Sequence, residues 1–168
     1  MPGFDPAFVA DTAAAWFGDN EETVRWREWW QQPPATPQKT AVYAELEAFE
    51  RELAQGAAAD PHDWSPRLRR ISEVLLSALD AEFADDAGAR LAGATTWLSL
   101  LNRRLDEKRV PLRLGRVYPG QRFDPDTMEA VDSLSGNRLL VHQPLSWVVR
   151  DLSHPKPRVA LRARVITA

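Results

Sequence analysis

Three histidines are the residues best suited to proton transfer or metal binding, and their positions support neither role. His62 lies in a segment of helix breaks, His142 in an alternating stretch that predicts a strand, and His154 in a predicted turn. None has an acidic residue at a spacing that implies a metal site or a catalytic triad. The chain also lacks a Gly-x-Gly-x-x-Gly sequence and a Walker loop. We therefore expect it to bind no nucleotide, metal or other cofactor.

Two close pairs of aspartates are the remaining candidates for acid–base chemistry. Asp85 stands beside Asp86, and Asp124 lies two residues before Asp126. Paired carboxylates can divide the work of a general acid and a general base. Each pair, however, comes just before a predicted helix or turn, where aspartate commonly caps the backbone. We interpret both pairs as caps and predict that the protein is not an enzyme, unless the fold assembles a site from distant residues.

The stretch from residue 120 to residue 131 is the most specific pattern in the chain. Gly120 follows a proline, which marks a turn. Asp124 before Pro125 biases the backbone away from helix and fixes a bend. A short helical turn is then predicted, with Asp126 as its cap and Glu129 three residues later. The side chains expected to seat this turn against a sheet are Phe123, Met128 and Val131.

Charge is distributed unevenly along the chain. Residues 1–108 hold 11 basic and 19 acidic residues, whereas residues 109–168 hold 10 basic and 5 acidic ones. A basic C-terminal segment favours an acidic partner. Nucleic acid is one such partner, but the arginines are spread along predicted strands and turns without a Lys/Arg cluster or a known nucleic-acid motif. We expect a protein partner and no nucleic acid.

Composition favours a folded protein of the cytoplasm. The 168 residues are 44% hydrophobic and include no cysteine, which fits a reducing compartment. No apolar run approaches the roughly 18 residues of a membrane span, and the first residues do not resemble a signal peptide. We expect no membrane association and a cytoplasmic location.

The N-terminal segment, residues 1–38, is rich in tryptophan and ends in a proline linker. Two short helices are predicted, one from Asp5 to Phe17 and one from Asn20 to Trp30. In the second, Trp26, Trp29 and Trp30 form one stripe. The stripe could dock a partner or lie on a membrane, but its face carries little positive charge for anionic lipid. We favour packing against the protein's own helices or across a dimer.

Three further helices are predicted in residues 39–108, the expected helical and dimerisation region. The first, residues 39–58, has a coiled-coil-type seam of Val42, Leu46, Phe49 and Leu53. The next two, residues 66–84 and about 87–108, form a hairpin whose apolar faces need a partner. The second has a seam of Leu91, Ala94, Leu98, Leu101 and Leu105, with Trp97 beside it. Either a second copy or residues 1–58 of the same chain can supply that partner.

Residues 109–168 change to a period of two and predict a small β-domain. Alternation runs through residues 110–118, 138–142 and 158–167, with turns at 133–137 and 153–157. The fold class is therefore α+β, with N-terminal helices and a helical hairpin, a bundle we expect dimerisation to complete, followed by a small C-terminal β-domain.

The order and wording of these segments resemble the GrpE family, the nucleotide-exchange factors of bacterial Hsp70 chaperones. That family's signature runs roughly Gly-x-x-Phe-Asp-Pro-x-x-His-Glu-Ala-Val, and this chain has Met128 at the position of the histidine. The residues it shares with the signature are Gly120, Phe123, Asp124, Pro125, Glu129, Ala130 and Val131. In the last predicted strand, Arg158, Val159, Ala163 and Val165 match, and Trp147-Val-Val-Arg resembles the strand before the final hairpin. The resemblance covers about residues 67–168.

The resemblance implies a co-chaperone in protein folding and the stress response. It would act as a homodimer and use its β-domain to bind the Hsp70 nucleotide-binding domain and release ADP. The implied contact residues are Arg158 and Val149, while Gly120, Phe123 and Pro125 would shape the loop that positions the domain. The chain departs from the family in its short N-terminal helix and in Leu152-Ser153, where the family has Gly-Tyr. The alternative is a GrpE-like scaffold that serves as a non-catalytic interaction module.

Overall fold

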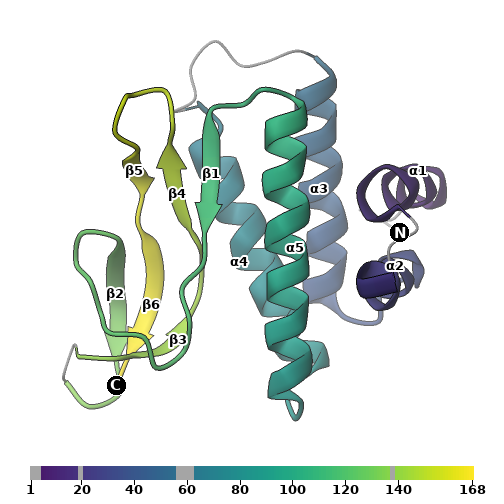
Figure 1. The fold of residues 1–168 in the computed structure, drawn as a ribbon. Coiled ribbons are helices and arrows are strands. Elements are labelled where there is room, and N and C mark those ends of the chain that lie inside the picture. The colour runs from purple at the N-terminus through teal and green to yellow at the C-terminus, as the bar shows by residue number, and fades with distance from the viewer. Residues whose placement is uncertain (1–4, 19–20, 56–62, 137–138) are drawn as a thin grey trace.

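The computed structural model describes residues 5–18, 21–55, 63–136 and 139–168. Its helices are α1 (Pro6–Phe17), the 3-10 turn η1 (Glu21–Thr23), α2 (Val24–Gln31), α3 (Pro37–Ala54), α4 (Ser65–Glu82) and α5 (Ala87–Glu107). Its strands are β1 (Leu112–Gly115), β2 (Met128–Ser133), β3 (Val141–Pro144), β4 (Val148–Asp151), β5 (Arg158–Leu161) and β6 (Ala163–Thr167). Helices followed by strands confirm the predicted α+β class, and Figure 1 shows them as two neighbouring layers.

The helices begin where the sequence supplies caps. Asp5 accepts a hydrogen bond from the Ala7 amide at 3.0 Å, and Thr36 accepts one from the Lys39 amide at 3.1 Å. Asp86 accepts from the Ala89 amide at 3.0 Å, which confirms the capping interpretation of the first aspartate pair. These side chains satisfy amides that have no partner inside their helix. The cap predicted at Asn20 and the helix end predicted at residues 55–58 fall wholly or partly outside the described residues.

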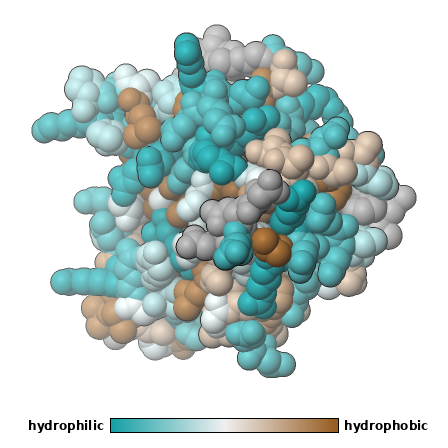
Figure 2. All heavy atoms as spheres, turned by 45° about the vertical axis from the view of Figure 1, so that its right-hand side comes forward, coloured by the Kyte–Doolittle hydropathy of each residue, from teal (hydrophilic) through white to brown (hydrophobic). Residues whose placement is uncertain are grey.

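The tryptophan stripe packs inside the chain. Trp26, Trp29 and Trp30 are all buried, and Trp29 and Trp30 meet Trp97 of α5 edge to face, with ring centroids 5.9 and 5.5 Å apart. Trp97 is completely buried, so it is the centre of the helical core, whereas Leu91 of the predicted seam is 44% exposed. Figure 2 shows the side of the molecule with α1 and α2 turned forward, where hydrophilic residues predominate and apolar ones are scattered. The buried tryptophans therefore cover apolar surface of α4 and α5 with residues of the same chain.

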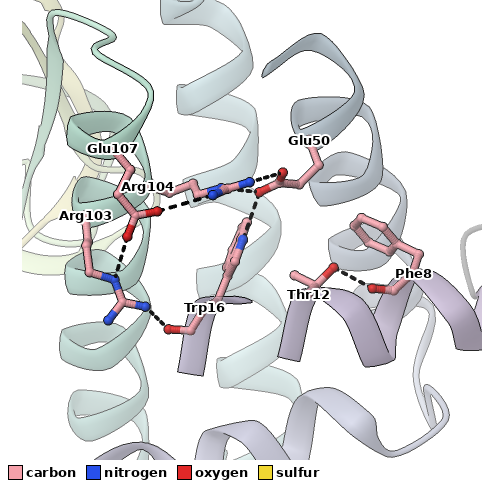
Figure 3. Close-up of polar contacts among 7 residues, drawn as sticks. All are labelled: Phe8, Thr12, Trp16, Glu50, Arg103, Arg104 and Glu107. Atoms are coloured by element: carbon pink, nitrogen blue, oxygen red, sulfur yellow. Dashed lines mark hydrogen bonds and ion pairs between the residues drawn. The ribbon is translucent and has the colours of Figure 1, made fainter. Parts of the chain in front are cut away.

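Polar contacts fasten α1 to this core (Figure 3). The Trp16 indole donates to Glu50 of α3 at 2.8 Å, and Glu50 also receives two hydrogen bonds from Arg104 of α5, at 2.7 and 2.8 Å. Arg103 donates to the carbonyl of Trp16. Three helices therefore converge on one carboxylate. Val42, Leu46, Phe49 and Leu53 are buried in the same core, so the chain itself supplies the partner that the helical faces required.

The strands form two three-stranded sheets, one antiparallel and one mixed. One has the order β1-β4-β5, and the other has β2-β6-β3, with β2 parallel to β6. The single strand predicted over residues 158–167 is in fact two strands in different sheets, which separate at Arg162. Leu112, Leu114, Trp147 and Val149 of the first sheet belong to the helical core, while the second sheet has its own small cluster of Val117, Met128, Val141, Val148, Ala163 and Val165. The helical core thus includes residues from all three predicted segments.

The helical turn predicted from Asp126 to Glu129 is wrong, because a single turn forms earlier, at residues 125–127, and Glu129 already belongs to β2. Asp124, rather than Asp126, organises the bend: its carboxylate accepts from the Asp126 amide at 3.0 Å and its carbonyl from the Met128 amide at 2.8 Å. The chain then continues directly into β2. Met128 is buried as predicted, but Val131 is 40% exposed. Pairing with β6 supplies backbone hydrogen bonds that a short isolated helical turn could not, so tertiary structure overrides the local capping signal.

Candidate functional site: the β1-β4-β5 sheet

Arg158 begins β5, which lies at the edge of its sheet with β4 on one side. Its side chain is exposed, and within the described part of the chain it makes no hydrogen bond or ion pair. An arginine at a free sheet edge with no internal partner is available to an external acidic group. The contact role that the resemblance implies for Arg158 stays a prediction.

Val149 lies elsewhere in the same sheet. It is completely buried and pairs with Leu114 of β1, and both side chains belong to the helical core. Because side chains alternate between the two faces of a strand, this register turns Val149 towards the helices. A partner cannot reach Val149 in the folded chain, so its role here is to hold β4 in place, and the contact predicted for it is not possible in this structure.

Gly120, Phe123 and Pro125 lie in the loop before β2 and next to the second sheet. Gly120 has φ of +82° and donates its amide to the Val141 carbonyl at 2.7 Å, so the turn needs a residue that tolerates positive φ. Phe123 is half-buried against the second cluster, and Val159 of β5 packs on the same cluster. The Pro125 carbonyl accepts a hydrogen bond from Arg162 at 3.4 Å. The loop therefore contacts the cluster on which Val159 of β5 packs, and it does not form a common surface with Arg158.

Additional arginines lie on the sheet beside β5. Arg113 of β1 and Arg150 of β4 occupy directly paired positions, and neither side chain makes a hydrogen bond or ion pair to a described residue. Lys156 is exposed in the turn between β4 and β5. Asp151 is buried and accepts hydrogen bonds from the amide and hydroxyl of Ser153, at 2.9 and 2.5 Å, so its carboxylate is held in the hairpin turn. Arg113, Arg150 and Lys156 thus give the described surface of this sheet a basic character.

The sheet is held firmly to the helices. Asn102 of α5 both donates to the Leu114 carbonyl, at 3.0 Å, and accepts from its amide, at 2.8 Å. Ser72 of α4 accepts from the Trp147 amide at 3.1 Å, and Arg69 donates to the Arg162 carbonyl at 2.7 Å. These side chains satisfy backbone groups in each of the segments that form the sheet. A force on the sheet is therefore transmitted to the helices.

A hollow of about 660 Å³ lies between α4, α5 and the β-strands. Its walls include Trp147, Leu91 and Tyr118, with Asp80 and Arg90 on the helical side. Burial raises the pKa of Asp80 above its ordinary value, although Gln143 donates to its carboxylate at 3.0 Å. The sequence analysis missed this hollow because its lining comes from three separate segments, each of which reads as ordinary amphipathic structure.

Candidate metal ligands do not cluster in the described residues. No group of three or more histidine, aspartate or glutamate side chains there could hold a metal ion. His142 is exposed on β3 and His154 lies in the β4–β5 turn, while His62 falls outside the residues described. Among the described helices, none is long and apolar enough to cross a membrane.

Comparison with known proteins adds no assignment: no family model, curated protein or solved structure matches this chain.

Proposed function

We propose that this protein is a GrpE-like co-chaperone of the cytoplasm that binds the nucleotide-binding domain of an Hsp70 and promotes release of ADP. The observation that carries the proposal is the position of Arg158, a residue shared with the family motif. It is exposed on the edge strand β5 with no side-chain hydrogen bond or ion pair to the described residues, in the same sheet as Arg113 and Arg150. An acidic surface on the partner would be electrostatically complementary to these basic side chains.

Exchange requires differential affinity rather than tight binding alone. The factor must bind the open form of the nucleotide-binding domain better than the closed form. Moving that domain from about 1:99 to mostly open needs several kcal/mol of preference. Bound ADP must weaken factor binding by the same amount. A sheet that is fixed to a rigid helical body by Asn102, Ser72 and Arg69 can hold the open form apart without bending itself.

The proposed factor needs no second copy to complete its helical core. The faces from which the sequence analysis expected a homodimer are covered by α1 and α2, through Trp26, Trp29 and Trp30. A homodimer would have to form through other surfaces. A single chain already presents the whole basic sheet.

The test is release of a fluorescent ADP analogue from the Hsp70 of the same organism. The protein should accelerate release in a saturable manner, and Arg158→Ala should weaken it about tenfold or more through loss of a charge-assisted contact. Arg122→Ala is the matched control, because Arg122 is also exposed and without a described partner but lies beside the second sheet. No acceleration by folded protein would refute the proposal and favour the non-catalytic interaction module.

A further inference from the structure

Arg113 and Arg150 form an unusual cross-strand pair. β1 and β4 are antiparallel, and their register places these two residues directly opposite each other. Leu112 and Leu114, on either side of Arg113, are buried against the helices, so Arg113 points to the outer face of the sheet. Directly opposed residues have Cβ atoms about 4.5–5.5 Å apart, and two like charges in such positions destabilise the sheet.

The described residues provide no ion-paired counter-charge for these two arginines. The neighbouring positions are Gly115 opposite Val148 and, on the next strand, Val159 opposite Arg150. The Nε atom of Arg150 lies 3.6 Å from the place that a Cβ would take at Gly115, so its side chain extends over the glycine. No described acidic residue forms an ion pair with Arg113 or Arg150. Exposed Arg113 and half-buried Arg150 therefore project from paired positions on the same face of the sheet.

We propose that Arg113 and Arg150 form a clamp for a carboxylate group of an aspartate or glutamate on the protein partner. The partner follows from the proposed function, on which this inference rests. A planar guanidinium presents paired N–H donors that match the two oxygens of a carboxylate. Two of them can bind one carboxylate from both sides, and the bound charge removes the repulsion within the pair.

The surroundings favour a carboxylate of a protein over nucleic acid. Non-specific single-strand binding normally adds exposed aromatic side chains, on which bases stack, to a long basic groove. On the outer face of this sheet the described neighbours are small or aliphatic. The exposed aromatic Tyr118 lies beyond the sheet and is covered by Arg116, whose guanidinium carbon is 4.4 Å from the ring centroid. The clamp fits one or two acidic side chains, not a run of phosphates.

The clamp gives substitutions opposite effects on the free protein and on the complex. Arg113→Glu turns a repulsive pair into an attractive one, so the free protein should unfold at a higher temperature, by about 2 °C. The same change should weaken partner binding by about tenfold to a hundredfold, because the partner's carboxylate then meets a like charge. Arg150→Glu should behave in the same way. A residue with only a structural role would not raise stability while it lowers affinity.

The first arm of the test measures thermal unfolding of the free protein and needs no partner. Arg122→Glu is the matched control, since the residue paired with Arg122 is Leu140 and the charge change there relieves no repulsion. A higher unfolding temperature for Arg113→Glu and Arg150→Glu, but not for the control, supports the clamp. Equal or lower temperatures for both clamp variants would show that the pair is not repulsive and would overturn the inference.

The second arm measures binding of the Hsp70 nucleotide-binding domain by calorimetry. Loss of affinity in both clamp variants, with the control unchanged, supports the inference. If wild type binds and is weakened by Arg158→Ala, but both clamp variants bind normally, the proposed function stands and the clamp is refuted.

The third arm applies if wild type does not bind that domain, so that the proposed function fails. An acidic hexapeptide of alternating Glu and Asp is then titrated while the Nε–Hε signals of the arginines are followed by NMR. If the signals of Arg113 and Arg150 shift more than that of Arg122, the pair binds carboxylates and the clamp is supported, with a different acidic protein as its partner. No preferential shift, or an equal response to inorganic phosphate or single-stranded DNA, would overturn it.

Discussion

The docking of the N-terminal segment against α5 can be tested with one methyl group at Gly93. This glycine lies inside α5, where alanine would normally stabilise the helix by about 1 kcal/mol. A Cβ at Gly93, however, would lie 2.6 Å from Cη2 of Trp26 and 2.8 Å from Cδ2 of Leu79. The Leu79 side chain can rotate, but the Trp26 ring is rigid and buried between its neighbours.

The expected sign follows from the two opposing effects. Overpacking a core costs about 1–3 kcal/mol, which exceeds the gain in helix propensity. Gly93→Ala should therefore lower the free energy of unfolding by about 1 kcal/mol. Gly88→Ala is the matched control, because a Cβ there meets Asp86 Oδ1 at an ordinary 3.5 Å and the site is exposed. That control should gain about 0.5 kcal/mol.

Urea unfolding followed by far-ultraviolet circular dichroism measures both variants, and the slope checks that unfolding exposes the same surface. Trp26→Phe provides a rescue, since phenylalanine lacks the ring atoms that approach Gly93. In that background Gly93→Ala should lose most of its cost, a coupling of about 1 kcal/mol. If Gly93→Ala instead stabilises the wild-type protein as Gly88→Ala does, α2 does not pack on α5 in solution and the covered helical core is incorrect.

Three further substitutions test single interactions. Glu50→Ala leaves the guanidinium of Arg104 without its bidentate partner and should lower the free energy of unfolding by about 2 kcal/mol. The control Glu47→Ala, which removes an exposed helical ion pair, should lower it by under about 0.5 kcal/mol. Equal losses for the two variants in urea unfolding would contradict this prediction. Burial lowers the pKa of Lys39 below its ordinary 10.5, so the unfolded chain binds more protons just below pH 10.5 and wild-type stability should rise with pH there relative to Lys39→Met. A constant difference between the two proteins across pH 8–10.5 would exclude this. Burial raises the pKa of Asp80 above 3.8, so its ionised carboxylate lowers the free energy of unfolding at pH values above the raised pKa. This destabilisation is relieved as pH falls and the carboxylate is protonated. Asp80→Asn should therefore gain more over wild type at pH 7 than at pH 4, and a larger gain at pH 4 would reverse the assigned sign.

The helices were predictable because their signals are local. Asp5 and Asp86 each precede an amphipathic run and accept an amide hydrogen bond at the predicted helix start, whereas α3 begins two residues before its predicted start, with Thr36 as its cap. The turn between β4 and β5 was predictable from the prolines at 155 and 157 for the same reason. Each of these features depends on a few consecutive residues, so no distant contact is needed to decide it.

The errors arose where distant pairing decided the local structure. The capping pattern at Asp126 favoured a helical turn, but pairing with β6 drew Met128 and the following residues into a parallel strand. Alternation from Arg158 to Thr167 read as one strand, yet the chain changes sheets at Arg162. In both places the backbone follows the partner that satisfies its hydrogen bonds, and sequence periodicity does not identify that partner.

The candidate site shows the same division. The motif predicted Arg158 as a contact residue, and the uneven charge indicated the C-terminal segment as the binding region. The alternation of strand residues also applied to Val149, but it could not tell which face of the sheet the helices cover. The pairing of Arg113 with Arg150 joins residues 37 positions apart and has no signature in either neighbourhood.

The sequence alone determined the class of structure, the helices of the N-terminal two-thirds and the basic character of the C-terminal strands, because composition, caps and periodicity act over short distances. Only the tertiary structure decided that Trp26, Trp29 and Trp30 close the helical core from within the chain. It also decided that Val149 is buried while the Arg158 side chain is exposed without a partner among the described residues, and that Arg113 and Arg150 occupy paired positions on the outer face of the sheet. Burial and cross-strand register depend on which surfaces meet, and that choice minimises exposed apolar area and unpaired backbone groups over the whole chain at once.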